Sequence, residues 1–137
     1  RTLREKVGDR AIMRALHFFN ENRRVAAQVE ALRAGDIEAF KAGVTASGNS
    51  SFKYLQNVYT IKNIAEQGLS LALCLTEDFL AGTGAVSRVH GGGFAGTIQA
   101  FVPVHDTAAY AARMNAVFGE GACHILSVRP SGACRIL

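Results

Sequence analysis

The chain has 137 residues, of which 49% are hydrophobic and 19% charged, and its formal net charge is +4. The length fits a single domain over residues 1–137, and the composition fits a packed globular fold and excludes a disordered chain. A membrane partner is not expected, because the sequence lacks the run of about eighteen apolar residues that a membrane-spanning helix requires.

Residues 2–33 predict a long amphipathic helix. Apolar residues recur there at spacings of three and four, with charges between them: Ile12, Leu16, Phe19, Val25, Val29 and Leu32. Residues 1–33 also hold eight of the fifteen Lys and Arg against four Asp and Glu. The interleaved acids and the lack of an aromatic platform accompanying the arginines favour a solvated helix face over a nucleic-acid surface. We therefore expect no nucleic-acid partner.

Two further helices are expected before residue 82. Gly35 should end the first helix, and Asp36 should cap a short second helix over residues 37–47. The serines and asparagines at the start of residues 47–60 are typical of turns and caps. Residues 61–81 then predict a third helix, with one apolar face made of Ile61, Ile64, Leu71, Leu75 and Phe79.

The pattern changes to strands beyond residue 84. Residues 85–89 alternate like a strand, and residues 97–104 form a second strand that stops near Pro103. Residues 106–119 predict a helix, and two last strands are expected over residues 122–130 and 132–137. The predicted class is α+β, with N-terminal helices packed on a small antiparallel sheet in the order strand, glycine turn, strand, helix, strand, turn, strand.

The cysteines and histidines do not predict a metal site or a disulfide framework. The three cysteines, Cys74, Cys123 and Cys134, include no Cys-x-x-Cys spacing, so we interpret them as small core side chains in a reducing, cytoplasmic protein. Three histidines are widely separated and lack a local carboxylate pattern: His90, His105 and His124. We expect no metal ligand among them.

Six glycines lie within residues 82–96, directly before the second strand. Gly91, Gly92 and Gly93 either turn a hairpin, with one or two residues at positive φ, or form a nest of backbone amides that holds an anion. No Gly-Lys-Ser/Thr follows, so this is not a Walker A loop, and a strand follows where a dinucleotide fingerprint requires a helix. Arg88 is either a surface cation at a strand end or a partner for the same anion.

The stretch SRVHGGGFAGTIQAFVP resembles the third conserved motif of the GHMP superfamily of sugar and small-molecule kinases, a glycine-rich loop with an aromatic residue before a core strand. The matching positions are Arg88, Gly91, Gly92, Gly93, Phe94 and Gly96. Three further stretches are similar to the galactokinase family within it: ENRRVAAQVEALRAGDIEAF, SGNSSFKYLQNVY and FGEGACHILSVRPSGACRIL. His90 departs from the small hydroxyl residue of many members, but it can still donate a hydrogen bond.

The resemblance covers nearly the whole chain and implies the C-terminal domain of a two-domain galactokinase. Such an enzyme transfers the γ-phosphate of ATP to the C1 hydroxyl of galactose with Mg²⁺, in a cleft between its domains. This chain would form one cleft wall, with Gly91–Gly93 close to the phosphate-binding loop and with Arg88, His90 and Gly96 supporting it. The ATP loop, the catalytic aspartate and the sugar-binding residues would lie in an N-terminal domain.

The same resemblance makes the N-terminal domain of the same chain the expected partner, together with galactose and ATP. We expect the present segment by itself to have no catalytic residue, to hold neither ATP nor Mg²⁺, and to self-associate through the face that the other domain would cover. Three alternatives remain: another GHMP kinase, a non-catalytic galactokinase-like sensor, and a free-standing binding module that uses the basic first helix.

Overall fold

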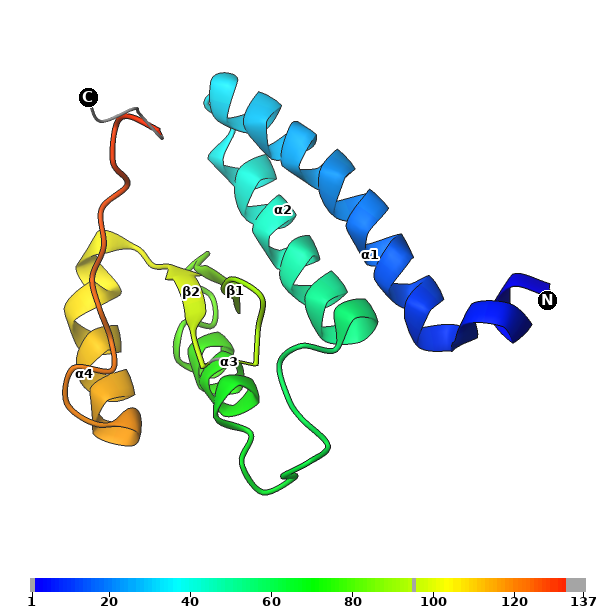
Figure 1. Ribbon diagram of the computed structural model, residues 1–137. Helices are drawn as coiled ribbons and strands as arrows, with labels where there is room; N and C mark the ends of the chain where they lie inside the picture. Colours follow the sequence, from blue (N-terminus) through cyan, green and yellow to red (C-terminus); the bar gives the residue numbers. More distant parts are fainter. Residues whose placement is uncertain (1, 95, 133–137) are drawn as a thin grey trace, which may run out of the picture. The chain divides into compact units, whose positions relative to one another are not determined.

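The computed structural model describes residues 2–94 and 96–132 and divides the chain into two compact units, Arg1–Pro103 and Val104–Leu137. The first unit contains, in order, α1 (Thr2–Arg33), α2 (Ile37–Ser50), the π-helical turn η1 (Ser51–Leu55), α3 (Gly68–Phe79), β1 (Val86–Val89) and β2 (Ile98–Phe101) (Figure 1). The second unit contains the 3-10 turn η2 (Val104–Asp106) and α4 (Thr107–Phe118). The predicted α+β class is confirmed.

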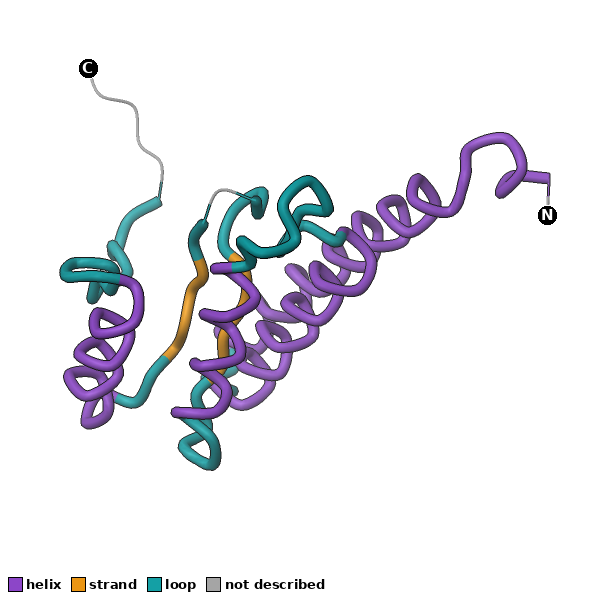
Figure 2. Tube along the Cα trace, turned by 90° about the horizontal axis from the view of Figure 1, so that it is seen from below, coloured by secondary structure: helices purple, strands orange, loops and turns teal. Residues whose placement is uncertain are grey.

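The helices α1 and α2 form a hairpin and run side by side in opposite directions (Figures 1 and 2). Gly35 stands at the corner with φ 71°, a left-handed conformation that glycine adopts without steric cost. The Asp36 carboxylate accepts a hydrogen bond from the Ala39 amide at 2.9 Å and so caps α2. Both corner predictions are therefore confirmed, and α2 extends to Ser50 before η1 continues the turn.

The face of α1 that meets the rest of its unit is not the expected apolar one. The predicted stripe is largely exposed, by 40–59%, at Leu16, Phe19, Val25, Val29 and Leu32. The side chains that instead contact α2 or β1 are polar: His17, Glu21 and Gln28, with Arg24 paired to Glu21 on the same face of α1. Positions 17, 21, 24 and 28 also recur every three or four residues, so periodicity alone could not tell which of two helical faces turns inward.

The sheet of the described residues is one antiparallel hairpin, in which Val86 pairs with Phe101 and Val89 with Ile98. Val89 is 1% exposed and forms the core of the first unit together with Val58 and Leu69. Both α2 and α3 pack on this hairpin, and an edge-to-face ring pair joins Phe40 of α2 to Phe101 at 5.3 Å. The hairpin is therefore packed against α2, which precedes residues 56–67 in the chain, and against α3, which follows them.

The third helix begins at Gly68 rather than at residue 61, so this prediction is wrong in its first two turns. Ile61 and Ile64 are 83% and 76% exposed in an irregular segment. The Gln67 side chain donates a hydrogen bond to the Ile64 carbonyl at 3.3 Å. Such local side-chain bonds compete with helical hydrogen bonds, which gives a physical reason for the late start.

The strand predicted over residues 122–130 is absent from the described part of the chain. Ile125, Leu126 and Val128 are instead 69–92% exposed. A strand needs a hydrogen-bonded neighbour, and most of the partner strand expected over residues 132–137 lies outside the described residues. The α4 prediction is confirmed, and the Asn115 side chain accepts a hydrogen bond from the Cys123 amide at 2.8 Å just beyond the end of this helix.

No helix in residues 2–94 and 96–132 has the length and apolar character needed to cross a bilayer.

Cys74 is exposed, so its expected place in the core is wrong. The buried face of α3 carries Leu69, Ala72 and Thr76, and Cys74 falls on the opposite side of the helix. Cys123 is partly exposed, and burial raises the pKa of its thiol. Cys134 lies outside the described residues.

Candidate functional site

The glycine run forms the turn of the β1–β2 hairpin. The His90 amide donates a hydrogen bond to the Thr97 carbonyl at 3.0 Å, one step beyond the last strand pair, and closes a loop over residues 91–96. Gly91, Gly93 and Gly96 have φ values of 66°, 75° and 95°, whereas Gly92 is outside the left-handed region. The hairpin alternative is therefore confirmed, with more left-handed positions than expected.

The tip of the loop is open. A Cβ atom built on Gly91 or Gly92 would meet no heavy atom within 4 Å. Among the described residues, the amides of Gly91, Gly92 and Gly93 donate no hydrogen bond. A right-handed residue followed by a left-handed one directs successive N–H groups into the same space, which is the geometry of an anion-binding nest. Gly93, with φ 75°, supplies the left-handed residue of such a pair.

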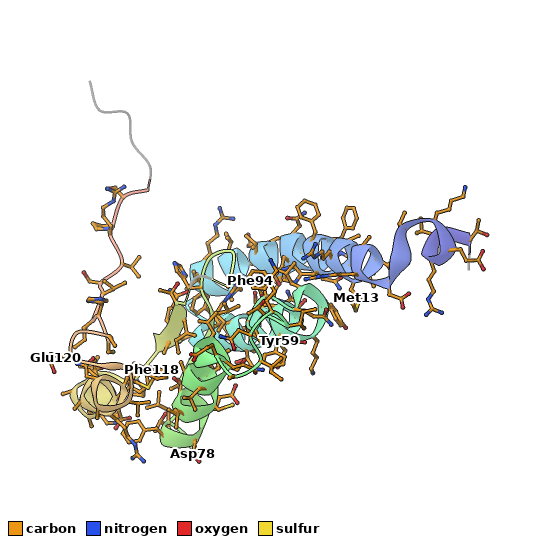
Figure 3. The ribbon with its side chains drawn as sticks, turned by 60° about the horizontal axis from the view of Figure 1, so that its bottom comes forward. Met13, Tyr59, Asp78, Phe94, Phe118 and Glu120 are labelled. Atoms are coloured by element: carbon orange, nitrogen blue, oxygen red, sulfur yellow. The ribbon has the colours of Figure 1, made fainter. Side chains whose placement is uncertain are left out.

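Phe94 follows the glycines and is the loop's aromatic residue (Figure 3). Its φ is 56°, which is uncommon for a bulky residue, and its side chain is 54% exposed. Its amide donates a hydrogen bond to the Asn57 carbonyl at 2.8 Å, so the strained residue is anchored through its backbone. His90, at the start of the loop, is exposed.

Asn57 is the loop's main internal contact, and the sequence pattern did not indicate it. It is 1% exposed, and its side-chain amide donates a hydrogen bond to the Gly92 carbonyl at 3.1 Å. A Cβ atom on Gly93 would lie 2.2 Å from the Asn57 carbonyl oxygen, so glycine is required there for close approach as well as for its φ. Asn57 stands thirty-five residues before Gly92, and nothing in the local sequence signals the contact.

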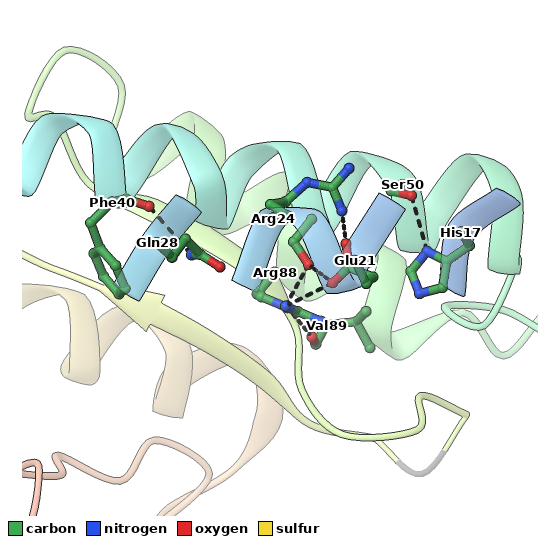
Figure 4. Close-up of polar contacts among 9 residues, drawn as sticks. His17, Glu21, Arg24, Gln28, Phe40, Ser50, Arg88 and Val89 are labelled. Atoms are coloured by element: carbon green, nitrogen blue, oxygen red, sulfur yellow. Dashed lines mark hydrogen bonds and ion pairs between the residues drawn. The ribbon is translucent and has the colours of Figure 1, made fainter. Parts of the chain in front are cut away.

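Arg88 does not stand free beside the loop. Its guanidinium donates hydrogen bonds to Ser47 at 2.5 Å and to the Val89 carbonyl at 3.0 Å, and it lies 3.8 Å from the Glu21 carboxylate (Figure 4). Burial lowers the pKa of its guanidinium below the usual value. The first of the two alternatives for Arg88, a surface cation, is therefore wrong, because Arg88 joins β1 to the helical hairpin. The second, a partner for an anion at the loop, stays a prediction.

Glu21 lies between two arginines and links three elements. Its carboxylate pairs with Arg24 on α1, accepts a hydrogen bond from Ser47 on α2 at 2.5 Å, and faces Arg88 on β1 (Figure 4). Burial and the charge of Arg88 lower the pKa of Arg24. Two guanidinium groups therefore share one carboxylate in a half-buried site, which leaves an excess of positive charge.

His17 extends this polar network toward the end of α2. Its Nδ1 lies 3.0 Å from the Ser50 hydroxyl (Figure 4). Burial, and then the charges of Arg24 and Arg88, lower the pKa of His17 below its usual value of 6.5. The imidazole is accordingly neutral at pH 7, where the Ser50 hydroxyl can satisfy one ring nitrogen.

A cavity of about 200 Å³ lies between α2, α3 and β1, lined among others by Asn49, Ser70, Glu77 and Arg88. Arg88 is the one predicted site residue that reaches it, and the glycine loop does not line it. Within residues 2–94 and 96–132, no group of three or more His, Cys, Asp or Glu side chains could hold a metal ion. The structure thus brings Gly91, Gly92, Gly93, Phe94 and Gly96 together in one loop, with Arg88 bonded elsewhere.

Comparisons with known proteins give no relative. No family model matches the chain, no curated protein matches it, and no solved structure matches its fold.

Proposed function

We propose that the chain is the C-terminal domain of a galactokinase of the GHMP superfamily, which transfers the γ-phosphate of ATP to the C1 hydroxyl of galactose. The observation that carries the proposal is the loop over residues 91–96, whose sequence resembles the superfamily motif and whose tip is free of side chains at Gly91, Gly92 and Gly93. The α+β arrangement and the helix corner at Gly35 support the same assignment.

The loop would form one wall of the cleft between two domains. Phosphoryl transfer depends mostly on positioning and on electrostatic support of the phosphate oxygens. Backbone amides of Gly91–Gly93 that are not bonded within the described residues can supply such support without a side chain in the way. Phe94 and His90, both exposed, would line the adjacent wall.

ATP and Mg²⁺ fit this arrangement in different ways. The open glycine tip suits a phosphate group, since donors at a nest favour negative charge. Mg²⁺ would be held by the phosphates and by carboxylates of the N-terminal domain, where the catalytic aspartate is also expected; when bound, it neutralises charge on the transferred phosphoryl group. The residues of this chain would position the phosphates and exclude bulky groups.

The test is phosphorylation of a panel of sugars by the full-length protein with ATP and Mg²⁺. Galactose 1-phosphate should be the main product, and the 137-residue chain alone should give no turnover once host kinase is removed. Main turnover of another sugar or alcohol would favour a different GHMP kinase. Binding of galactose and ATP without turnover would favour the sensor, and salt-dependent nucleic-acid binding without ATP binding would favour the free-standing module.

A further inference from the structure

Asn57 contacts the glycine loop through both its backbone and its side chain. Its carbonyl accepts the Phe94 amide at 2.8 Å, and its side-chain amide donates to the Gly92 carbonyl at 3.1 Å. These two bonds hold the residues on either side of Gly93. Among the described residues, the amides of Gly91, Gly92 and Gly93 donate no hydrogen bond. Asn57 therefore holds the loop, while these three amides can still donate to a ligand.

The backbone is strained in both of the segments that meet at this contact. Gln56 and Phe94 have φ values of 54° and 56°, and they are the two non-glycine residues with positive φ among residues 2–94 and 96–132. Gln56 immediately precedes Asn57, and the amide of Phe94 donates a hydrogen bond to the Asn57 carbonyl. Strained residues of this kind persist where surrounding contacts enforce them, and they cluster at functional sites.

The side chain of Asn57 is only partly satisfied. Its Oδ1 is buried and accepts no hydrogen bond from the part of the chain that the structure describes. A buried acceptor without a partner destabilises a fold, so an asparagine chosen for stability alone would be a poor solution here. The need to donate a hydrogen bond to the Gly92 carbonyl from a position against Gly93 explains why an asparagine stands here.

We propose that Asn57 is the positioning residue of the loop, which sets the Gly91–Gly93 amides in the arrangement that binds the nucleotide phosphates. Asn57 acts through Gly92 and Phe94 and does not itself touch the nucleotide. The assignment of the anion as a nucleotide rests on the function proposed above, whereas the control of loop geometry by Asn57 does not. The segment that follows α2 and η1 thereby determines the shape of a loop whose Gly92 lies thirty-five residues after Asn57.

The experiment compares Asn57→Ala with wild type in the full-length protein, with Asn63→Ala as the matched control because Asn63 is an exposed asparagine of the same connecting segment. Asn57→Ala should raise the KM for ATP about tenfold or more and leave the KM for galactose within about twofold, as expected for a lost interaction that acts on one substrate. Hydrogen exchange at the Phe94 amide, measured without nucleotide, should quicken by a similar factor. Asn63→Ala should change none of these.

Two more variants keep the test decisive. Asn57→Asp removes the donor to Gly92, and protonation of the new carboxyl restores one, so the protection of the Phe94 amide should recover as the pH falls below about 4. If Asn57→Ala fails to fold, Gly93→Ala separates the same contact from the loop side and should give the same loss of ATP affinity.

The proposal is overturned if folded Asn57→Ala keeps both the Phe94 exchange rate and the KM for ATP within twofold of wild type. It is also overturned if the KM values for ATP and galactose rise equally, as a general loss of structure would produce. A wild-type protein that neither binds nor uses ATP would remove the proposed function, and the exchange rate at Phe94 would then still decide whether Asn57 controls the loop.

Discussion

Replacing Gly92 by valine in the full-length protein tests whether the loop tip faces a ligand, because this position can accept a side chain without strain. Gly92 is outside the left-handed region, and a Cβ atom there would meet no heavy atom within 4 Å. The loss of stability should therefore be below about 1 kcal/mol, in line with ordinary surface substitutions. The melting temperature should fall by only a few degrees, at about 2–8 °C per kcal/mol for domains of this size.

Turnover should respond much more strongly. A valine side chain at an open loop tip would hold phosphate oxygens away from the amides of Gly91–Gly93, and a misplacement of about 1 Å can cost about a hundredfold in rate. That factor corresponds to roughly 2.7 kcal/mol in the activation barrier, several times the expected loss of stability. The two quantities are measured on the same purified variant, by thermal denaturation and by steady-state kinetics with ATP and galactose.

Gly93→Ala is the matched comparison, because it should damage both quantities. Gly93 has φ 75°, and its Cβ would lie 2.2 Å from the Asn57 carbonyl oxygen. Left-handed strain costs about 1–3 kcal/mol, before any displacement of Asn57. If Gly92→Val keeps turnover within a few fold of wild type, the loop is only a turn and the reasoning about an open ligand-facing tip is refuted.

Three further predictions concern the helical hairpin. Because the folded-state pKa of His17 is depressed, the unfolded chain binds more protons below about pH 6.5; stability should fall as the pH drops through that region, and His17→Gln should reduce this fall in pH-dependent melts. Glu21→Ala should cost about 2–3 kcal/mol by leaving Arg24 and Arg88 without a counter-charge, below the full range for buried pairs because the site is part-exposed; chemical denaturation measures it, and equal stability would contradict the account. The chain alone should self-associate at high concentration through the exposed face of α1, and Val29→Lys should weaken this in light scattering; a strict monomer in the unmodified chain would contradict it.

Local chemistry in the sequence predicted some elements well. Gly35, Asp36 and the glycine run each carry a conformational preference of their own, so the corner and the hairpin turn could be placed from residues alone. The limits of α3 depended on a Gln67 side chain bonding to Ile64, and this competition is invisible to a periodicity count. The strand predicted over residues 122–130 needed a hydrogen-bonded neighbour, and the residues expected to provide it lie mostly outside the described part of the chain.

The residues of the loop were predicted from the sequence, but the buried residues that contact the loop and Arg88 were not. The loop residues Gly91–Gly93 and Phe94 were found by pattern, and they do lie together. Asn57 gave no signal, because asparagine in a polar stretch is typical of a turn and its burial arises only when distant segments meet. Arg88 was assigned to the loop because it is close to the loop along the chain. Its partners in the structure, Glu21 and Ser47, are brought to it by α1 and α2.

The polar contacts between α1, α2 and β1 have a consequence for how the hairpin finds its alignment. Apolar faces slide with little change in energy, but Glu21, Ser47 and Arg88 must meet with defined hydrogen-bond geometry. Sliding α1 by one turn, about 5.4 Å, would carry Glu21 and Arg24 along together but would separate the Glu21 carboxylate from Ser47 and Arg88 in a half-buried place. The network therefore fixes the alignment of α1, α2 and β1. The outer surface of α1 can then vary in sequence without changing how the helical hairpin closes.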